Sequence, residues 1–403
     1  MKRILFTLVI LGGLVFSAKS QTTDDVLNLL IQKKVVSQKD ADSIRAEAAI
    51  AAQANLAKVK AFPINAGKKI IIAGYTQVRY QALEETGKID GFDIRRARLD
   101  VKGIISPYWS YRVQFELGGT AKLPEVYAPK LLDAYAELKL NDYLNFTIGQ
   151  AKVPFSLENL TASNKLELID RSQAVEALVA RGKDVGGNQN GRDIGIQLGG
   201  TILKVKDRPV VDYRLGVYNG SGINTVDNNE NKDIAARLLL HPVVGLDISG
   251  ALYDGSRLAP EVKEVKDKDG KITTVATAAK TVNRDRYGFD VNYDWRNLAI
   301  RSEYIHGTDN VFNKKGFYDQ IDEEGYYVQA GYYFMQKKLQ LIAKYDFYDA
   351  DKAKADDAST WYVFGANYNF NANVRLQANY TVKQEEGPSI NNNYASIQFQ
   401  IGF

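Results

Sequence analysis

The chain of 403 residues contains no cysteine and only two histidines. Neither a disulfide nor a thiolate metal site can therefore form. Ser302 and His306 fall on one face of a predicted strand, but four residues of extended chain separate them by about 13 Å, too far for a nucleophile and its base. The other histidine, His241, precedes Pro242 and is interpreted as a turn residue. We therefore expect no enzyme activity, no metal site and no cofactor.

A long apolar helix is also absent. No stretch approaches the roughly 20 apolar residues that a membrane-spanning helix requires. An apolar run from Ile4 to Phe16 follows two basic residues and precedes small residues at positions 18 and 20, which is the pattern of a cleaved signal peptide. We expect residues 1–20 to be removed and the protein to be exported.

Charge of one sign is not in excess either. Once Lys2, Arg3 and Lys19 are removed, 49 basic residues remain against 48 acidic ones. A mature chain this close to neutral argues against a nucleic-acid partner. Acidic clusters at 349–351 and 356–357 are interpreted as exposed loops, with binding of a divalent cation as the alternative.

The chain does contain many segments that alternate polar and apolar side chains. In the last of them, Ile397, Phe399, Ile401 and Phe403 share one face, and polar residues occupy the other. Segments of this kind number sixteen: 69–82, 92–105, 109–119, 131–140, 143–151, 192–202, 210–219, 233–241, 245–254, 284–294, 298–307, 325–335, 337–348, 359–370, 372–384 and 393–403. An even number of strands with one face for lipid and one for water predicts a closed transmembrane β-barrel.

The links between these strands alternate in length. Short links at 106–108, 141–142 and 371 contrast with long ones at 152–191, 220–232, 255–283 and 308–324. Short periplasmic turns on one rim and long outer loops on the other are typical of such barrels.

Residues 21–62 follow a different period. Val26, Leu29 and Leu30 recur at helical spacing, and a second helical stripe begins at Ile44. This pattern predicts two helices, which form either a solvated alanine-rich linker or a periplasmic extension that pairs as a coiled coil. The predicted fold is thus all-β: a signal peptide at 1–20, a short N-terminal helical extension at 21–62, and a 16-stranded antiparallel barrel at 63–403.

Strand parity assigns the charged side chains to the lumen. Ala97 and Leu99 alternate with Arg96, Arg98 and Lys102. An arginine or lysine at the lipid midplane costs roughly 2–4 kcal/mol, so the charged face must point to water. The same rule turns these residues inward: Asp100, Arg112, Gln114, Glu116, Asp133, Tyr135, Glu137, Lys139, Arg214, Arg237, Arg301, Lys344, Arg375 and Lys383.

Five motifs follow one another along the predicted barrel: GFDIRRARL at 91–99, GQAKVPFSLE at 149–158, IDRS at 169–172, NGRDIG at 190–195 and LGVYNGSG at 215–222. With the closing aromatic strand, this order resembles the phosphate-selective porin O and P family of outer-membrane channels. The resemblance implies a trimeric barrel of sixteen strands in the bacterial outer membrane. It also implies a third outer loop folded into the pore, basic residues along the permeation path, and Phe403 within the signal read by the barrel-assembly machinery.

The predicted function is a passive, water-filled channel for small hydrophilic solutes that favours anions such as phosphate or polyphosphate. The loop at 152–191 is expected to narrow the lumen. Guanidinium groups at a constriction can replace part of the hydration shell of an oxyanion. The candidate pathway residues are Arg96, Arg98, Lys102, Arg112, Arg171, Arg192, Arg214 and Arg237.

Alternatives stay open. Arginines paired with carboxylates, such as Arg112 with Glu137, would only brace the wall, and nearly equal numbers of lumenal acids and bases favour weak selectivity. A second function is a structural barrel whose helical extension tethers periplasmic partners. The expected partners are outer-membrane lipid, the assembly machinery, small solutes and two further copies of the chain in a homotrimer.

Overall fold

The computed structural model describes residues 33, 62–65, 68–118, 129–180, 191–259, 261–268, 272–313, 315 and 318–403. The predicted signal peptide and nearly all of the predicted helical extension lie outside these ranges. The chain divides into two units, Met1–Lys60 and Ala61–Phe403, and every strand below belongs to the second. Within the described ranges there is no helix whose length and apolarity would let it cross a membrane.

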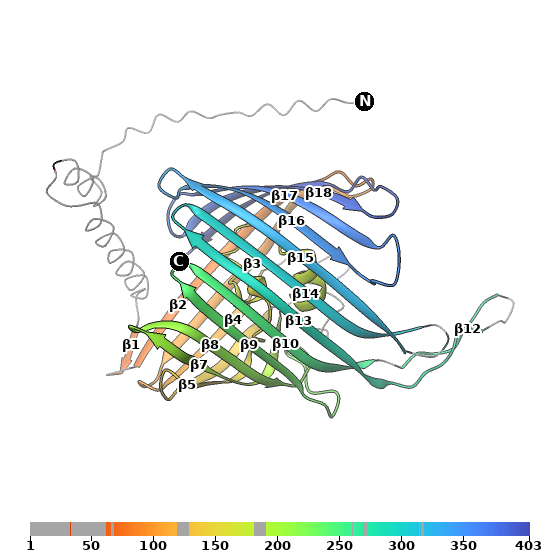
Figure 1. Ribbon diagram of the computed structural model, residues 1–403, viewed down its shortest axis with the longest axis horizontal. Coiled ribbons are helices and arrows are strands. Elements are labelled where there is room, and N and C mark those ends of the chain that lie inside the picture. The colour runs from red at the N-terminus through yellow and green to blue at the C-terminus, as the bar shows by residue number, and fades with distance from the viewer. Residues whose placement is uncertain are drawn as a thin grey trace. The chain divides into compact units, whose positions relative to one another are not determined.

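Sixteen antiparallel strands form a closed barrel, in which each strand pairs with the next and the last pairs with the first (Figure 1). The strands are β2 (Lys68–Leu83), β3 (Gly91–Ile104), β4 (Trp109–Glu116), β5 (Lys130–Lys139), β6 (Asn145–Lys152), β7 (Arg192–Val205), β8 (Arg208–Tyr218), β9 (Asp233–Val243), β10 (Leu246–Ala259), β13 (Lys280–Trp295), β14 (Leu298–Phe312), β15 (Tyr318–Phe334), β16 (Leu339–Asp349), β17 (Ala358–Asn369), β18 (Val374–Glu385) and β19 (Tyr394–Gly402). A short strand β1 (Phe62–Asn65) pairs with β2, and β11 (Val265–Lys266) with β12 (Ile272–Thr274) forms a separate hairpin. The predicted sixteen-stranded barrel is confirmed.

The two faces of the barrel wall follow the alternation in the sequence. Inside, polar side chains such as Gln77 and Gln398 are fully buried. Outside, apolar side chains such as Phe364 and Phe399 are exposed to 55% and 42%. This pattern is the reverse of that in a water-soluble protein, and it matches a wall with lipid outside and polar groups inside.

The wall is not equally high around the barrel. Strands β4 and β6 have eight residues each, whereas β13, β14 and β15 have 16, 15 and 17. The predicted long link at 308–324 is therefore wrong, because most of it continues β14 and β15, with Thr308 opposite Asp322 and Asn310 opposite Gln320. Most side chains on both faces of this outer part are polar, so alternation does not mark it as strand.

The predicted link at 255–283 also has more strand than expected. β10 continues to Ala259, β13 begins at Lys280, and the β11–β12 hairpin lies between them. The added pairs between β10 and β13 extend this hairpin of the wall beyond the apolar band. Neither face of the hairpin needs apolar side chains there.

Candidate functional site

The described residues between β6 and β7, 153–180 and 191, form an inner loop that contacts the opposite wall of the barrel. It contains three short helical pieces: α3 (Leu157–Leu160), α4 (Gln173–Val175) and the π-helical turn η1 (Glu176–Ala180). Ser156 caps α3 by accepting a hydrogen bond from the backbone N–H of Asn159, at 3.1 Å. The loop is therefore a folded element inside the lumen rather than a link over the rim.

Two carboxylates of the wall hold the starts of α3 and α4. Glu303 on β14 accepts hydrogen bonds from the backbone N–H groups of Leu157 and Glu158, at 3.0 and 3.3 Å. Asp346 on β16 accepts from the backbone N–H of Gln173 at 3.1 Å. A carboxylate satisfies the free N–H groups at a helix N-terminus, so these contacts fix the inner loop across the lumen.

Amide side chains of the wall hold the middle of the inner loop. Gln377 Nε2 and Asn367 Nδ2 donate to the backbone carbonyl of Glu167, at 3.0 and 2.7 Å. Asn379 Oδ1 accepts from the backbone N–H of Ile169 at 2.8 Å. The polar backbone of the loop is thus satisfied by β17 and β18, which permits an irregular segment inside a barrel.

An apolar cluster holds the end of the inner loop against another part of the wall. Val175 and Leu178 are buried together with Ile305 of β14, Tyr218 of β8 and Tyr253 of β10. Burial of these side chains stabilises the docked loop by the hydrophobic effect. The loop therefore occupies the lumen beside β8, β10 and β14.

A cavity of about 1110 Å³ lies between the inner loop and strands β3 to β10. It is lined near one end by the short turn at 106–108 and near the other by Lys152, Leu157 and Thr161. Basic and acidic side chains line it in equal number: Arg112, Lys139, Lys152, Lys204, Arg214 and Arg237 against Asp133, Glu137, Asp142, Asp212, Asp247 and Asp290. Local placement, and not net charge, must therefore decide which ions this space prefers.

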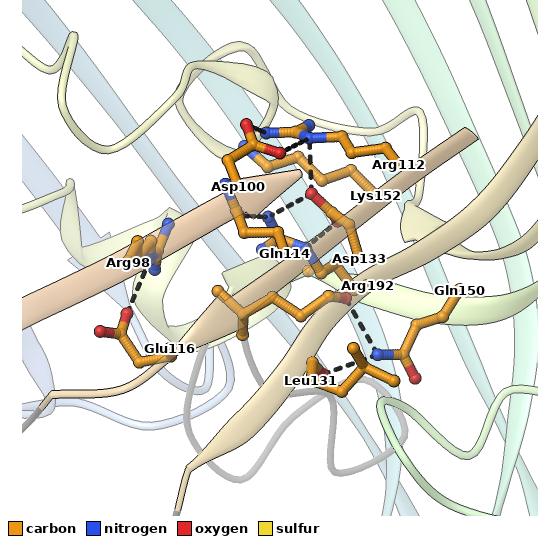
Figure 2. Close-up of polar contacts among 12 residues, drawn as sticks. Arg98, Asp100, Arg112, Gln114, Glu116, Leu131, Asp133, Gln150, Lys152 and Arg192 are labelled. Atoms are coloured by element: carbon orange, nitrogen blue, oxygen red, sulfur yellow. Dashed lines mark hydrogen bonds and ion pairs between the residues drawn. The ribbon is translucent and has the colours of Figure 1, made fainter. Parts of the chain in front are cut away.

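Arginines and carboxylates form a paired cluster on β3, β4, β5 and β7, at the inner end of this cavity (Figure 2). Arg112 pairs with Asp100 through two hydrogen bonds of 2.8 Å and with Asp133 at 3.1 Å. Arg192 donates to Asp133 at 2.5 Å. Arg98 pairs with Glu116, which lies opposite it on the neighbouring strand, at 2.7 Å. Much of the positive charge here is thus matched by carboxylates.

Lys152 is the exception in this cluster, because neutral groups hold its ammonium. Lys152 Nζ donates to the backbone carbonyl of Asn159 and, at 3.1 Å, to that of Thr161. Within the described part of the chain, no carboxylate lies within ion-pair distance of Lys152 Nζ. Arg171 lies on the same loop and likewise donates to a carbonyl, that of Glu158, at 3.1 Å.

At the rim formed by the short turns, the charges are paired in water. Asp142 lies 2.5 Å from Lys204 Nζ and 3.0 Å from Lys139 Nζ. Hydrogen bonds from Lys204 and Lys139 lower the pKa of Asp142 to about 2. Asp142 therefore stays ionised throughout the physiological range, and its charge offsets those of the two lysines.

The structure brings together some of the predicted pathway residues and separates others. Arg98, Arg112, Arg171 and Arg192 surround one end of the inner loop, and Arg96 lies next to them, donating to Gln77 Oε1 at 2.8 Å. The remaining three are placed as follows: Arg214 lines the cavity, Arg237 pairs with Asp290 at 2.8 Å, and Lys102 lies on β3 opposite Arg112. Phe403, predicted as part of the assembly signal, exchanges backbone hydrogen bonds with Gly74 outside the site.

Arg112 has different partners from the one predicted. The expected pair with Glu137 is wrong, because Arg112 turns toward Asp100 and Asp133, while Glu137 accepts a hydrogen bond from Ser110 at 3.1 Å. Asp133 and Glu137 flank Tyr135, the residue opposite Arg112, so both carboxylates are diagonal neighbours of Arg112 and parity does not choose between them.

Arg95 was missed by the sequence reasoning. Gln77 pairs with Arg96 and Val78 pairs with Ile94, so Arg95 is the extra residue of a bulge. Its guanidinium lies 2.5 Å from Asp170 of the inner loop. The signal in the sequence was the doublet of two consecutive arginines in an otherwise alternating strand, which indicates a break in parity.

A closed barrel of sixteen strands, with a polar interior, an apolar exterior and a loop folded into the lumen, defines a porin of the bacterial outer membrane. The family described as "Phosphate-selective porin O and P" matches residues 67–403, and the chain belongs to this family. A passive channel, and not an enzyme, is the activity that this family and this fold indicate.

Solved structures of other outer-membrane channels share the fold. OmpT of Vibrio cholerae superposes with a TM-score of 0.60 at 13% identity, over 85% of this chain and 100% of that one. The channel DcaP of Acinetobacter baumannii gives 0.60 at 12% identity, over 85% and 99%. An anion-selective porin from Comamonas acidovorans gives 0.59 at 14% identity, over 83% and 100%.

One curated relative matches by sequence. It is an uncharacterized protein of Aquifex aeolicus (strain VF5), 25% identical over 253 residues, which are 57% of this chain. The chain spans about half the length of this relative, 56%.

Proposed function

We propose that the protein conducts small hydrophilic solutes passively and favours anions, oxyanions such as phosphate among them. The proposed path follows the cavity beside β3 to β10 and passes Arg112, Lys152 and Arg214. The remaining predicted pathway residues, Arg96, Arg98, Lys102, Arg171, Arg192 and Arg237, act mainly by holding the inner loop and the wall in place around this path.

The position of Lys152 carries the proposal. Most basic groups of the cluster are neutralised by a carboxylate, whereas Lys152 is held by the carbonyls of Asn159 and Thr161. Its positive charge is therefore available to an ion that reaches the inner end of the cavity. An oxyanion there would meet the ammonium of Lys152 and the guanidinium of Arg112, whose side chain is 25% exposed.

Reversal potentials in planar bilayers test this proposal. In a potassium chloride gradient we expect an anion preference, and titrated phosphate should block the chloride current. Lys152→Gln should lose most of the preference and weaken phosphate block about tenfold, since one charged contact contributes roughly 1.4 kcal/mol. Lys204→Gln, which removes a paired lysine of the same cavity, is the control. An unchanged preference in Lys152→Gln would contradict the proposed path.

We further propose that three copies assemble into a homotrimer. One OmpT structure is described as a trimer form, and the low wall of this barrel supports assembly. Eight residues, the length of β4 and of β6, cover roughly 19 Å of the membrane normal at a tilt of about 45°, less than the apolar band of about 25 Å. A neighbouring subunit on this face would replace lipid where the strands are too short.

We also propose that residues 21–62 form a periplasmic helical extension after removal of 1–20. The helical spacing of Val26, Leu29 and Leu30 supports it. If the extension tethers periplasmic partners, its deletion should leave conductance intact and weaken the cell envelope. If conductance falls instead, the extension belongs to the channel.

A further inference from the structure

A second cavity, of about 500 Å³, lies on the other side of the inner loop. It is enclosed by residues 157–168 of the loop and by strands β13 to β18. Amide and phenol side chains are prominent in its lining: Asn292, Gln329, Gln340, Asn367, Tyr327 and Tyr333. Its size is in the range of sites for small molecules.

Three buried polar atoms of this lining have no hydrogen-bond partner among the described residues. They are the hydroxyl of Tyr327, Oδ1 of Asn367 and Nε of Arg375. Tyr327 and Asn367 are each only 1% exposed. Buried polar groups are nearly always satisfied, so three orphans around one cavity indicate a missing hydrogen-bonding occupant.

Most charges of the cavity lining are compensated by a neighbouring opposite charge, whereas Arg375 donates to the backbone carbonyls of Leu166 and Asn164, at 3.0 and 3.1 Å. Arg301 pairs with Asp294 at 2.8 Å and with Glu167 at 3.4 Å, and Glu158 pairs with Lys344 at 3.3 Å. A charged ligand would have to compete with these pairs. An uncharged ligand would leave them intact.

The orphan atoms also define the chemistry of the occupant. Arg375 Nε–H only donates, Asn367 Oδ1 only accepts, and the Tyr327 hydroxyl does both. A hydroxyl group of a ligand can complement each of them, because it donates and accepts. We propose that this cavity is a binding site for a neutral polyhydroxylated solute, a sugar of one or two rings.

This proposal goes beyond the anion path, since it concerns a separate cavity and an uncharged ligand. Because the inner loop forms one side of the cavity, bound sugar should also restrict the loop and lower the ion current. Glucose, maltose and sucrose should each be titrated into single channels in a planar bilayer, with a polyethylene glycol of matched size as the control for simple volume exclusion. Binding in detergent should be measured in parallel by calorimetry.

The matched variants are Tyr327→Phe and Tyr218→Phe. Each removes only a buried hydroxyl that has no hydrogen-bond partner among the residues that the structure describes, but Tyr218 lies in the apolar cluster and not at this cavity. We expect at least one sugar to reduce the current saturably, and Tyr327→Phe to weaken its binding about three- to tenfold, the loss of one hydrogen bond. Tyr218→Phe should bind like the parent.

The proposal is overturned if no sugar acts saturably on conducting channels, in which case water occupies the cavity, or if both variants bind equally. The reversal potential of the same channels separates this result from the anion proposal. It should be the same in Tyr327→Phe as in the parent, so either proposal can fail without the other.

Discussion

The carboxylate of Glu303 on β14 accepts a hydrogen bond from the backbone N–H of Leu157 at 3.0 Å, and 146 residues of chain separate the two. The same carboxylate also accepts from the next N–H along the loop, that of Glu158. One side chain of the wall thus sets the position at which the inner loop crosses the lumen. Conductance should depend on this carboxylate even where no solute touches it.

Glu303→Ala should therefore widen the channel. Two backbone N–H groups would lose their acceptor, which weakens docking of the loop by roughly 2–3 kcal/mol. We expect a higher single-channel conductance and more frequent current steps in planar bilayers. Glu137→Ala removes a lumenal carboxylate that accepts from Ser110 and has no contact with the described part of the loop, so it is the control for the loss of one negative charge in the lumen. Equal conductance in Glu303→Ala and the parent would show that the other contacts between the loop and the wall are sufficient to dock the loop.

Asp100→Asn should increase anion preference. Asp100 holds Arg112 through two hydrogen bonds of 2.8 Å, and its removal leaves Arg112 with Asp133 alone. The Asp100 carboxylate repels an anion 4 Å away by roughly 1 kcal/mol in water. Removal of this repulsion corresponds to about a fivefold rise in the ratio of chloride to potassium permeability. The reversal potential measures it. Asp142→Asn, at the exposed rim, should change it much less, and a shift toward cations in Asp100→Asn would refute the path.

Gly149→Ala should destabilise the barrel. Gly149 has φ +124°, and a Cβ atom there would lie 2.3 Å from the backbone oxygen of Ala134. Strain of this kind costs about 1–3 kcal/mol. Gly250→Ala is the control, because its nearest neighbour would be Phe289 at an ordinary 3.5 Å. Urea unfolding in lipid vesicles should separate the two variants, and equal midpoints would contradict the expected strain.

Ala136→Trp should disrupt the proposed trimer. Ala136 lies on the outer face of the short strand β5, opposite Tyr111 and Ile148 on the neighbouring strands. Ala343→Trp places the same side chain on the outer face of β16, across the barrel. Electrophoresis of unheated samples after chemical cross-linking should show fewer trimers for Ala136→Trp only. A loss of trimers in Ala343→Trp instead would move the interface to the β16 face.

Alternation was enough to predict the barrel, because a lipid-facing strand can hardly carry charge on its outer face. It turned Arg98, Glu116, Lys344 and Arg375 inward correctly. The role of Arg95 could not be obtained in this way, since it depends on a bulge that shifts the register by one residue. The partner of Arg112 could not be obtained either, because Asp133 and Glu137 have the same parity and flank the residue opposite Arg112.

The docking of the inner loop was also beyond the sequence. Glu303, Asp346 and Asn379 look like ordinary lumenal residues until the fold brings them to backbone groups of a segment 145 to 210 residues away. No local pattern encodes such contacts. The orphan atoms of the second cavity could not be predicted for the same reason. An atom can be identified as lacking a hydrogen-bond partner only after the fold has placed its neighbours.

The seam between β19 and β2 has a kinetic consequence. It pairs Tyr394 with Leu83 and Gly402 with Tyr75, so more than 300 residues must be in place before the sheet can close. Contacts this distant in sequence form slowly, and until they form both β2 and β19 expose unpaired backbone edges. The vulnerable period in the life of this protein is therefore the interval before closure, when its edges can pair with another chain.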